Sequence, residues 1–157
     1  MKMKKSLCLL ISILSVILFA GCSNGGTNAN VDLSAVMKDI KSQVTFTDTM
    51  DLTKDDLNSN YGIKAEDVKQ FAALVDTTGI KADELVMIEG KDADSAKRIK
   101  TALDTRYQDK INANITYLPE QYAIIKKCSV RQSGNYVSML VSPNAEKIVK
   151  IYDGYVK

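Results

Sequence analysis

The first 21 residues constrain the rest of the chain most, because they have the pattern of a segment that is removed before the protein folds. Three lysines lie within the first five positions, and residues 7–19 form an apolar run that only two serines interrupt. Ala20 and Gly21 follow this run. A basic start, a short apolar run and small residues at its end predict a secretory signal. The run is too short for a membrane-spanning helix, which needs about 20 apolar residues.

The residues Leu18-Phe19-Ala20-Gly21-Cys22 resemble the lipobox of bacterial lipoproteins, in which a pair of small residues precedes a cysteine. The resemblance implies that Cys22 receives a diacylglyceryl group and becomes the N-terminus of the mature chain. Phe19 departs from the pattern, which more often has leucine at that place. Two acyl chains give stable membrane attachment, whereas one holds a protein only marginally. The alternative is an ordinary signal peptide, or an uncleaved anchor, with Cys22 present by coincidence.

Removing the signal changes the charge balance of the chain. The full sequence has 21 Lys+Arg and 19 Asp+Glu. Residues 1–21 contain three lysines and no acidic residue, so the remainder has 18 cations against 19 anions and a net charge of −1. A nucleic-acid-binding protein needs a basic surface field, which this remainder lacks. We therefore expect no nucleic-acid partner.

The cysteine and histidine content excludes several kinds of catalytic and metal site. If Cys8 leaves with the signal and Cys22 carries lipid, Cys128 stands alone and no internal disulfide can form. The sequence has no histidine, which excludes Ser-His-Asp and Cys-His nucleophilic sites. Histidine-containing zinc sites are excluded too, and a lone thiolate cannot build a cluster. We expect neither a metal nor a cofactor.

The chain is expected to have three parts: a lipoprotein signal peptide over residues 1–21, a lipidated cysteine with a flexible tether over residues 22–31, and one globular α+β domain over residues 32–157. Residues 23–31 are small and mostly polar, and they reach only about 30 Å when fully extended. The domain should therefore work close to the bilayer. Its length is sufficient for one hydrophobic core.

Capping residues and apolar spacing predict the helices of this domain. Asp32 is an expected N-cap for a helix with one apolar stripe, formed by Leu33, Val36, Met37, Ile40 and Val44. Thr53 and Asp56 form a capping-box pattern for a short helix that Tyr61-Gly62 would end. The longest helix should begin at residues 90–92 and carry an ion pair between Asp94 and Arg98. Pro119 and Pro143 suit the first positions of two further helices.

Two hairpins are expected between these helices. Residues 68–76 and 84–89 form the first, and residues 127–132 and 136–141 form the second. Gly134-Asn135 should be the two central residues of the second turn, which pairs Ser133 with Tyr136. We expect residues 45–51 to be a loop and residues 112–116 a polar link. The fold class predicted is α+β: a four-stranded antiparallel sheet, built as two ββα units, with helices packed on one face.

From about Val31 onward the chain resembles the bacterial lipoprotein family of domain of unknown function 4358. The resemblance depends on four short motifs: Asp83-Glu84, Tyr117-Leu118-Pro119-Glu120-Gln121, Gly134-Asn135-Tyr136-Val137 and Val141-Ser142-Pro143. It implies an exported, lipid-anchored protein, found mostly in Gram-positive anaerobes. It implies no activity.

Few residues stand out as candidates for chemistry. Three carboxylate pairs are best explained as solvated turns and helix starts, because adjacent residues do not converge on one face: Asp55-Asp56, Glu66-Asp67 and Asp83-Glu84. Cys128 is expected to pack inward and to be unreactive. Tyr117 and Tyr136 lie in or beside predicted loops and are the expected partner surface.

Two functional hypotheses follow from these residues. The first is a binding or interaction module at the outer face of the cytoplasmic membrane, with an envelope protein or a wall ligand as its partner. The second is a histidine-free envelope enzyme that acts on wall polymers. An exposed apolar or tyrosine surface would favour the first, and a deep pocket with two inward carboxyl groups would favour the second.

Overall fold

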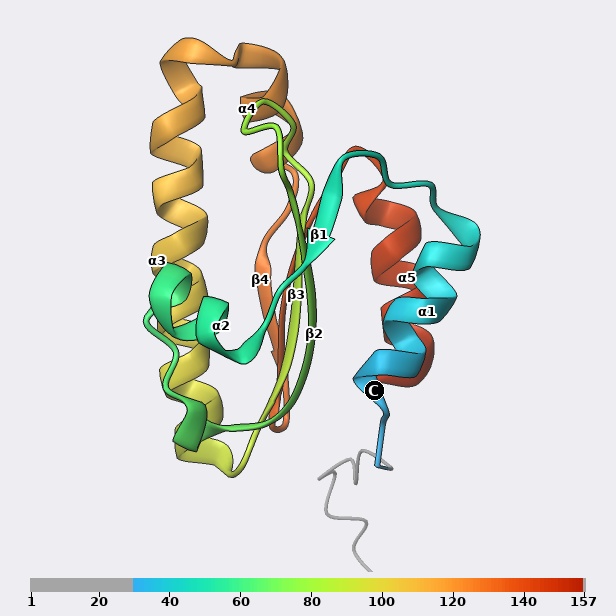
Figure 1. The fold of residues 1–157 in the computed structure, drawn as a ribbon, viewed down its shortest axis with the longest axis vertical. Coiled ribbons are helices and arrows are strands. Elements are labelled where there is room, and N and C mark those ends of the chain that lie inside the picture. The colour runs from blue at the N-terminus through green and yellow to red at the C-terminus, as the bar shows by residue number, and fades with distance from the viewer. Residues whose placement is uncertain (1–29, 157) are drawn as a thin grey trace, which may run out of the picture.

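The computed structural model describes residues 30–156, which form an α+β fold around a five-stranded antiparallel sheet (Figure 1). Within these residues the strand order is β1-β2-β3-β5-β4. The elements follow the chain as α1 (Leu33–Gln43), β1 (Thr49–Asp51), α2 (Lys54–Tyr61), the 3-10 helix η1 (Ala65–Asp67), β2 (Val68–Asp76), β3 (Glu84–Gly90), α3 (Ala93–Tyr117), α4 (Pro119–Ile125), β4 (Val130–Ser133), β5 (Tyr136–Val141) and α5 (Ala145–Tyr155).

The helix starts predicted at Asp32, Thr53 and Pro119 are confirmed, whereas the last helix, α5, begins at Ala145, two residues after the predicted Pro143. The Asp32 carboxylate accepts from the Ser34 N–H at 2.9 Å at the start of α1. Thr53 and Asp56 form the reciprocal capping box of α2. Gly62 ends α2 in the left-handed conformation, with φ +67°, which a residue with a Cβ adopts less readily.

Both predicted hairpins are present, and the register predicted for the second is confirmed. Ser133 pairs with Tyr136, and Val130 pairs with Met139. Gly134 has φ +56°, as the first central residue of a type II′ turn requires. β3 pairs with β2 on one side and with β5 on the other, so β3 and β5 are inner strands and β4 lies at the edge of the sheet.

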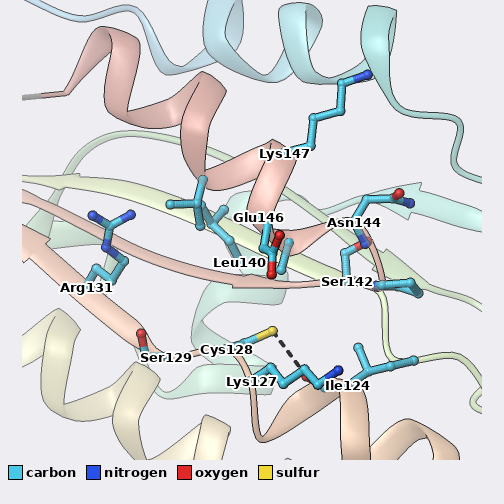
Figure 2. A pocket seen from close by; sticks show the side chains of 13 residues that line it. Ile124, Lys127, Cys128, Ser129, Arg131, Leu140, Ser142, Asn144, Glu146 and Lys147 are labelled. Atoms are coloured by element: carbon cyan, nitrogen blue, oxygen red, sulfur yellow. Dashed lines mark hydrogen bonds between the residues drawn. The ribbon is translucent and has the colours of Figure 1, made fainter.

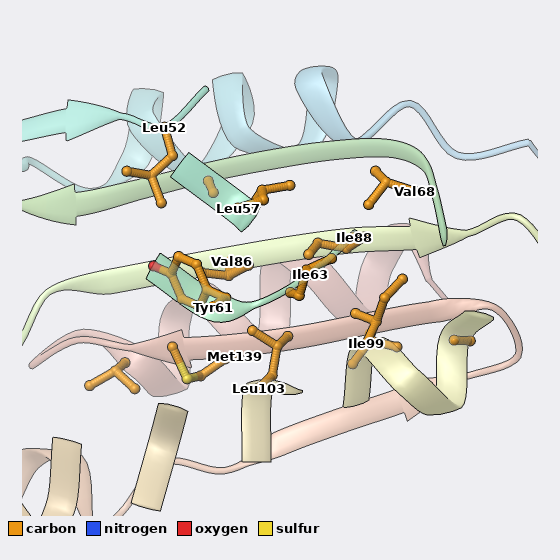
Figure 3. Close-up of a cluster of buried hydrophobic side chains, with 14 of the residues drawn as sticks. Leu52, Leu57, Tyr61, Ile63, Val68, Val86, Ile88, Ile99, Leu103 and Met139 are labelled. Carbon is orange, nitrogen blue, oxygen red and sulfur yellow. The ribbon is translucent and has the colours of Figure 1, made fainter. Parts of the chain in front are cut away.

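Helices cover both faces of the sheet, so the prediction of helices on one face is wrong. Figure 1 shows α2, α3 and α4 on one side of the sheet and α1 with α5 on the other. The buried apolar residues accordingly form two clusters. The first contains Leu57, Val86, Ile99, Leu103 and Met139, many of which are labelled in Figure 3. The second contains Leu33, Ile40, Leu74, Met87 and Ile148.

The prediction of four strands is also wrong, because β1 lies inside the segment expected to be a loop. Thr49–Asp51 pairs antiparallel with the end of β2, and the following Leu52 N–H donates to the Ala73 carbonyl at 2.9 Å. The three residues of β1 are too few to show the alternation of apolar and polar residues that indicates a strand in a sequence. β1 therefore depends on pairing with β2, which local sequence does not report.

α3 does not end where the sequence predicted, and its first turn makes a different ion pair. The helix continues through residues 112–116 and ends at Tyr117, next to the proline that begins α4. Asp94 pairs with Lys97 at 3.4 Å. Arg98 instead bonds to the Asp67 carboxylate, with an Nε–Oδ2 distance of 3.1 Å.

The two ββα units occur in the predicted order, but they do not form a symmetric duplication. α3 packs in the first buried cluster, whereas α5 packs in the second, on the opposite face of the sheet. A two-fold rotation that exchanges the antiparallel neighbours β3 and β5 would keep both helices on one face. The likeness between the two units is therefore one of connection order.

Candidate functional site

A groove runs beside the edge strand β4, on the side of the sheet that α5 covers. Its upper part is a cavity of about 680 Å³ between the end of α4, the residues leading into β4 and the first half of α5 (Figure 2). Its lower part is a cavity of about 300 Å³ between the end of β4 and the second half of α5. Arg131 lines both parts. We call the two parts together the β4 groove.

The groove exists because the two helices on this face do not reach the edge of the sheet. α1 packs over β2 and against α5, and α5 packs over β5. The Arg131 guanidinium spans the remaining gap and pairs with Asp153 on α5, with Nη1–Oδ1 at 2.9 Å and Nη2–Oδ2 at 3.1 Å. This two-point ion pair marks the boundary between the upper and lower parts.

The upper part of the groove has an apolar floor and a charged rim. Ile124, Leu140 and Val149 supply the apolar side chains. Lys127 and Glu146 supply the charges at the rim, whereas the Lys147 side chain extends away from the cavity toward α1 (Figure 2). The Lys147 ammonium donates to the Gln43 carbonyl at 2.8 Å, and neither lysine has a carboxylate partner among residues 30–156. The cavity is therefore suited to an apolar group that carries a negative charge nearby.

Two side chains of the groove that resemble nucleophiles, Ser142 and Cys128, are engaged in other hydrogen bonds. The Ser142 hydroxyl donates to the Asp83 carboxylate at 2.7 Å and accepts from the Asn144 N–H at 3.2 Å. The Cys128 thiol donates to the Ile124 carbonyl, with an Sγ–O distance of 3.5 Å (Figure 2). Cys128 is half-buried, and burial raises the pKa of its thiol, which disfavours the reactive thiolate.

Glu84 corrects the prediction that the carboxylate pairs are solvated. Its side chain has 0% exposure, and its carboxylate accepts from Tyr61 Oη at 2.9 Å, Arg106 Nε at 2.9 Å and Lys110 Nζ at 2.9 Å. Burial alone would raise the pKa of Glu84, but the two cations outweigh it and hold the pKa below its usual value. All its partners are structural, so this cluster fastens α2 and α3 to the start of β3.

Asp67 is the second exception among the predicted carboxylates. It is buried and bonds to Arg98 and Ser95 of α3. Asp55 and Glu66 are exposed as expected, and Asp56 caps α2. The sequence did contain a signal that Glu84 is buried. Arg106 and Lys110 are spaced i,i+4 on one helix, so two cations on one helix face were available to pair with it. A carboxylate that begins an apolar strand needs such cationic partners.

The structure does not bring Tyr117 and Tyr136 together. Tyr117 ends α3 and is 83% exposed. Tyr136 is 3% exposed and accepts a hydrogen bond from the Val31 N–H at 3.1 Å. It pairs with Glu89 at the end of the sheet where α3 begins, so the whole length of α3, about 36 Å, separates the two tyrosines. Only Tyr117 is available to a partner.

Cys22, the predicted lipidation site, lies outside the described residues. Within residues 30–156 no group of three or more Cys, Asp or Glu side chains is placed to hold a metal ion. No helix in the same range is both long enough and apolar enough to cross a membrane.

A family model described as "Domain of unknown function (DUF4358)" matches residues 42–142. No curated protein and no solved structure matches the chain. The matched region includes the five described strands and the strand side of the β4 groove, while the whole of α5 lies beyond it.

Proposed function

We propose a function from the premise that this chain belongs to the DUF4358 family, whose model covers residues 42–142. The proposed function is that of a lipid-anchored binding module at the outer face of the cytoplasmic membrane of a Gram-positive cell. The observation that carries the binding activity is the β4 groove, which combines an apolar floor with a charged rim beside an edge strand. Pockets of this composition bind ligands by burying an apolar group and orienting it with a few polar contacts.

The charges of the groove favour binding over hydrolysis of wall polymers. Hydrolysis by two carboxyl groups needs both of them free and facing one reacting centre. Glu146 is the only acidic residue of the upper part, and Asp153 in the lower part is held by Arg131. Ser142 has the Asp83 carboxylate beside it, but no other described side chain bonds to Asp83 and orients it as a base, and Cys128 donates only to the backbone carbonyl of Ile124. The groove therefore supplies recognition rather than an acid–base pair.

The membrane location is supported by the sequence ahead of the domain. The basic start, the apolar run of residues 7–19 and the Gly21-Cys22 site agree with export followed by lipidation. The net charge of −1 after residue 21 gives no attraction to anionic lipid, so the two acyl chains on Cys22 would supply the attachment.

The anchor is tested by growing a Gram-positive host on a palmitate analogue that can be coupled to a dye. The wild-type chain should carry the label and be digested by protease added to intact protoplasts. Cys22→Ala should lose the label and accumulate as the longer precursor. The matched controls are Cys8→Ala and Cys128→Ala, which should label and mature normally. A labelled Cys22→Ala chain of mature size would refute the lipid anchor.

A further inference from the structure

The outer edge of β4 presents backbone groups that no other described segment uses. In a two-residue hairpin the residues that flank the turn exchange both backbone hydrogen bonds, and the pattern alternates along the strands. Ser133 and Arg131 therefore bond to β5, while the N–H and C=O groups of Val130 and Gln132 face away from the sheet. None of the other hydrogen bonds among residues 30–156 reaches these four groups.

The β4 groove lies where one face of an added strand would place its side chains. Side chains alternate between the two faces of a strand. Val130 faces the α3 side, and Arg131 faces the α5 side, where the groove runs. In an added antiparallel strand, residues opposite Ser129 and Arg131 would therefore extend toward Leu140 and Val149 on the groove floor. A cavity of about 680 Å³ has room for more than one large apolar side chain there.

The charges at the rim favour an acidic segment. Five ionisable side chains line the two parts of the groove: Lys127, Arg131, Glu146, Lys147 and Asp153. Arg131 and Asp153 neutralise each other, and the Lys147 ammonium extends away from the cavity to the Gln43 carbonyl at the end of α1, which leaves Lys127 as the cation that an occupant can meet (Figure 2). Lys127 has no ion-pair partner among residues 30–156 and precedes the free edge strand, where a carboxylate on an added strand would meet it.

Two other occupants fit this surface less well. In the register that pairs Val130 with Gln132, a second copy of β4 would bring Arg131 opposite Arg131, and in any register it has no acidic residue between positions 127 and 133 for Lys127. The tether, residues 23–29, contains no large apolar residue for the floor and no carboxylate for the rim. The surface therefore fits a separate polypeptide better than either part of this chain.

We propose that β4 accepts an extended, acidic peptide segment as a sixth, antiparallel strand, with the segment's apolar side chains held in the β4 groove. This rests on the proposed function as a binding module and names the class of its partner. Main-chain hydrogen bonds at a sheet edge supply affinity in this mode of recognition, and the pockets for alternate side chains supply specificity.

The test uses the full chain, solubilised from membranes in mild detergent, and a dye-labelled eight-residue peptide. The peptide alternates threonine with leucine, has a glutamate added at each end, and is blocked at both termini. It should bind in fluorescence anisotropy. Methyl groups on the threonine nitrogens, which face β4 when leucine enters the groove, should weaken binding about tenfold or more. Methyl groups on the leucine nitrogens face solvent and should change it little.

Two variants of the chain examine the edge and the rim separately. Gln132→Pro removes an outward-facing N–H, a position where an edge strand tolerates proline, and should weaken the peptide about tenfold. Asp51→Pro is the matched control: it removes an N–H from β1, the opposite edge strand, and should leave peptide binding unchanged. Lys127→Glu should weaken the acidic peptide about fivefold and favour a peptide with lysine at each end instead. Circular dichroism confirms the fold of each variant.

The results of these experiments test strand addition at β4 separately from the lipid anchor on Cys22. No binding up to about 1 mM, or equal weakening by both methylation patterns, would overturn strand addition at β4. A detergent-solubilised dimer that Gln132→Pro converts to a monomer would assign the edge to a second copy and overturn it as well. The peptide titration does not require a lipid on Cys22, so absence of the acyl label would not affect the proposal of strand addition. A failed titration likewise leaves the anchored module with a different ligand.

Discussion

Glu84 is the residue whose environment differs most from what its neighbours in the sequence indicate. It begins the strand Glu84–Gly90, in which every residue is buried. Two α3 side chains, Arg106 and Lys110, neutralise it, and the Arg106 guanidinium also lies 5.6 Å from the centre of the Tyr61 ring. Burial and the charge of Glu84 raise the pKa of the Tyr61 hydroxyl, so it remains a donor. One carboxylate thus links three elements.

Replacing Glu84 by glutamine should destabilise the fold by about 3 kcal/mol at neutral pH, because it leaves two partly buried cations without a counter-charge. Chemical denaturation measures this change. Glu66→Gln is the matched control, because Glu66 is exposed and should change stability by less than about 0.5 kcal/mol. An equal effect of the two substitutions would mean that the buried cluster contributes nothing.

The difference between Glu84→Gln and wild type should also shrink in acid. The native pKa of Glu84 is lowered, so the unfolded chain takes up this proton first as the pH falls. The contribution of Glu84 is therefore complete above the pKa of an unfolded glutamate, about 4.3, and is lost as the pH drops through its native pKa. Wild type should lose stability more steeply than the variant below about pH 4.

Cys128 should react slowly with thiol reagents in the native protein. Its raised pKa lowers the thiolate fraction, and its position against Ile124 restricts access. Mass spectrometry of the peptide that contains Cys128 should show alkylation at least about tenfold faster after unfolding. Similar rates before and after unfolding would identify a reactive thiol in the β4 groove and contradict the expected inert role.

At the scale of elements, a helix or strand could be predicted from the sequence when neighbouring residues determine it, and could not when distant segments do. The start of α1 and the β4–β5 turn were predictable, because an N-cap and a Gly at the first turn position act on neighbouring residues. β1 and the second helical layer were not, because both depend on pairing between distant segments. The run Leu85-Val86-Met87-Ile88 did contain a signal, since a strand buried on both faces reads as a continuous apolar run.

The candidate site was less predictable than the fold for the same reason. The β4 groove brings together the end of α4, β4 and α5, whose residues are separate in the sequence and have no shared motif. Tyr136 sits beside a turn, which indicated exposure, but its hydroxyl is covered by the segment that begins at Val31. Cys128 packs against the same buried cluster as Val130, as predicted, but it precedes β4 and also borders the β4 groove, which strand alternation did not indicate.

The junction between β3 and α3 gives a prediction at this scale. A Cβ at Gly90 would lie 2.7 Å from the Ala96 backbone nitrogen, so the strand and the helix approach too closely for any side chain. Gly90→Ala should destabilise the protein by about 1–3 kcal/mol. Gly154→Ala is the matched control, because its Cβ meets nothing within 4 Å in α5, and it should stabilise by about 0.5–1 kcal/mol. Thermal unfolding of both variants would show opposite shifts, and shifts of the same sign would contradict this account.

On the scale of the whole molecule, the described chain enters at one end, and three of its five exposed large apolar side chains lie at the other. Val31 contacts Tyr136 near the start of α3, whereas Ile115 and Tyr117 project from the end of α3. Ile80, in the β2–β3 connection, lies at that second end too, because the nearby Ala82 N–H donates to Gln121 of α4 at 2.7 Å. With Cys22 anchored and the tether extended, this second end would face away from the bilayer.

The contacts at Val31 have a mechanical consequence. Its N–H donates to Tyr136 on β5, its carbonyl accepts from Gln70 on β2 at 2.6 Å, and the Leu33 N–H donates to the same glutamine at 3.0 Å. Tension applied ahead of Asn30 therefore reaches two strands that flank the centre of the sheet before it can unwind α1. A domain held by its N-terminus in a moving envelope would carry that load through the sheet, and its first helix would be spared.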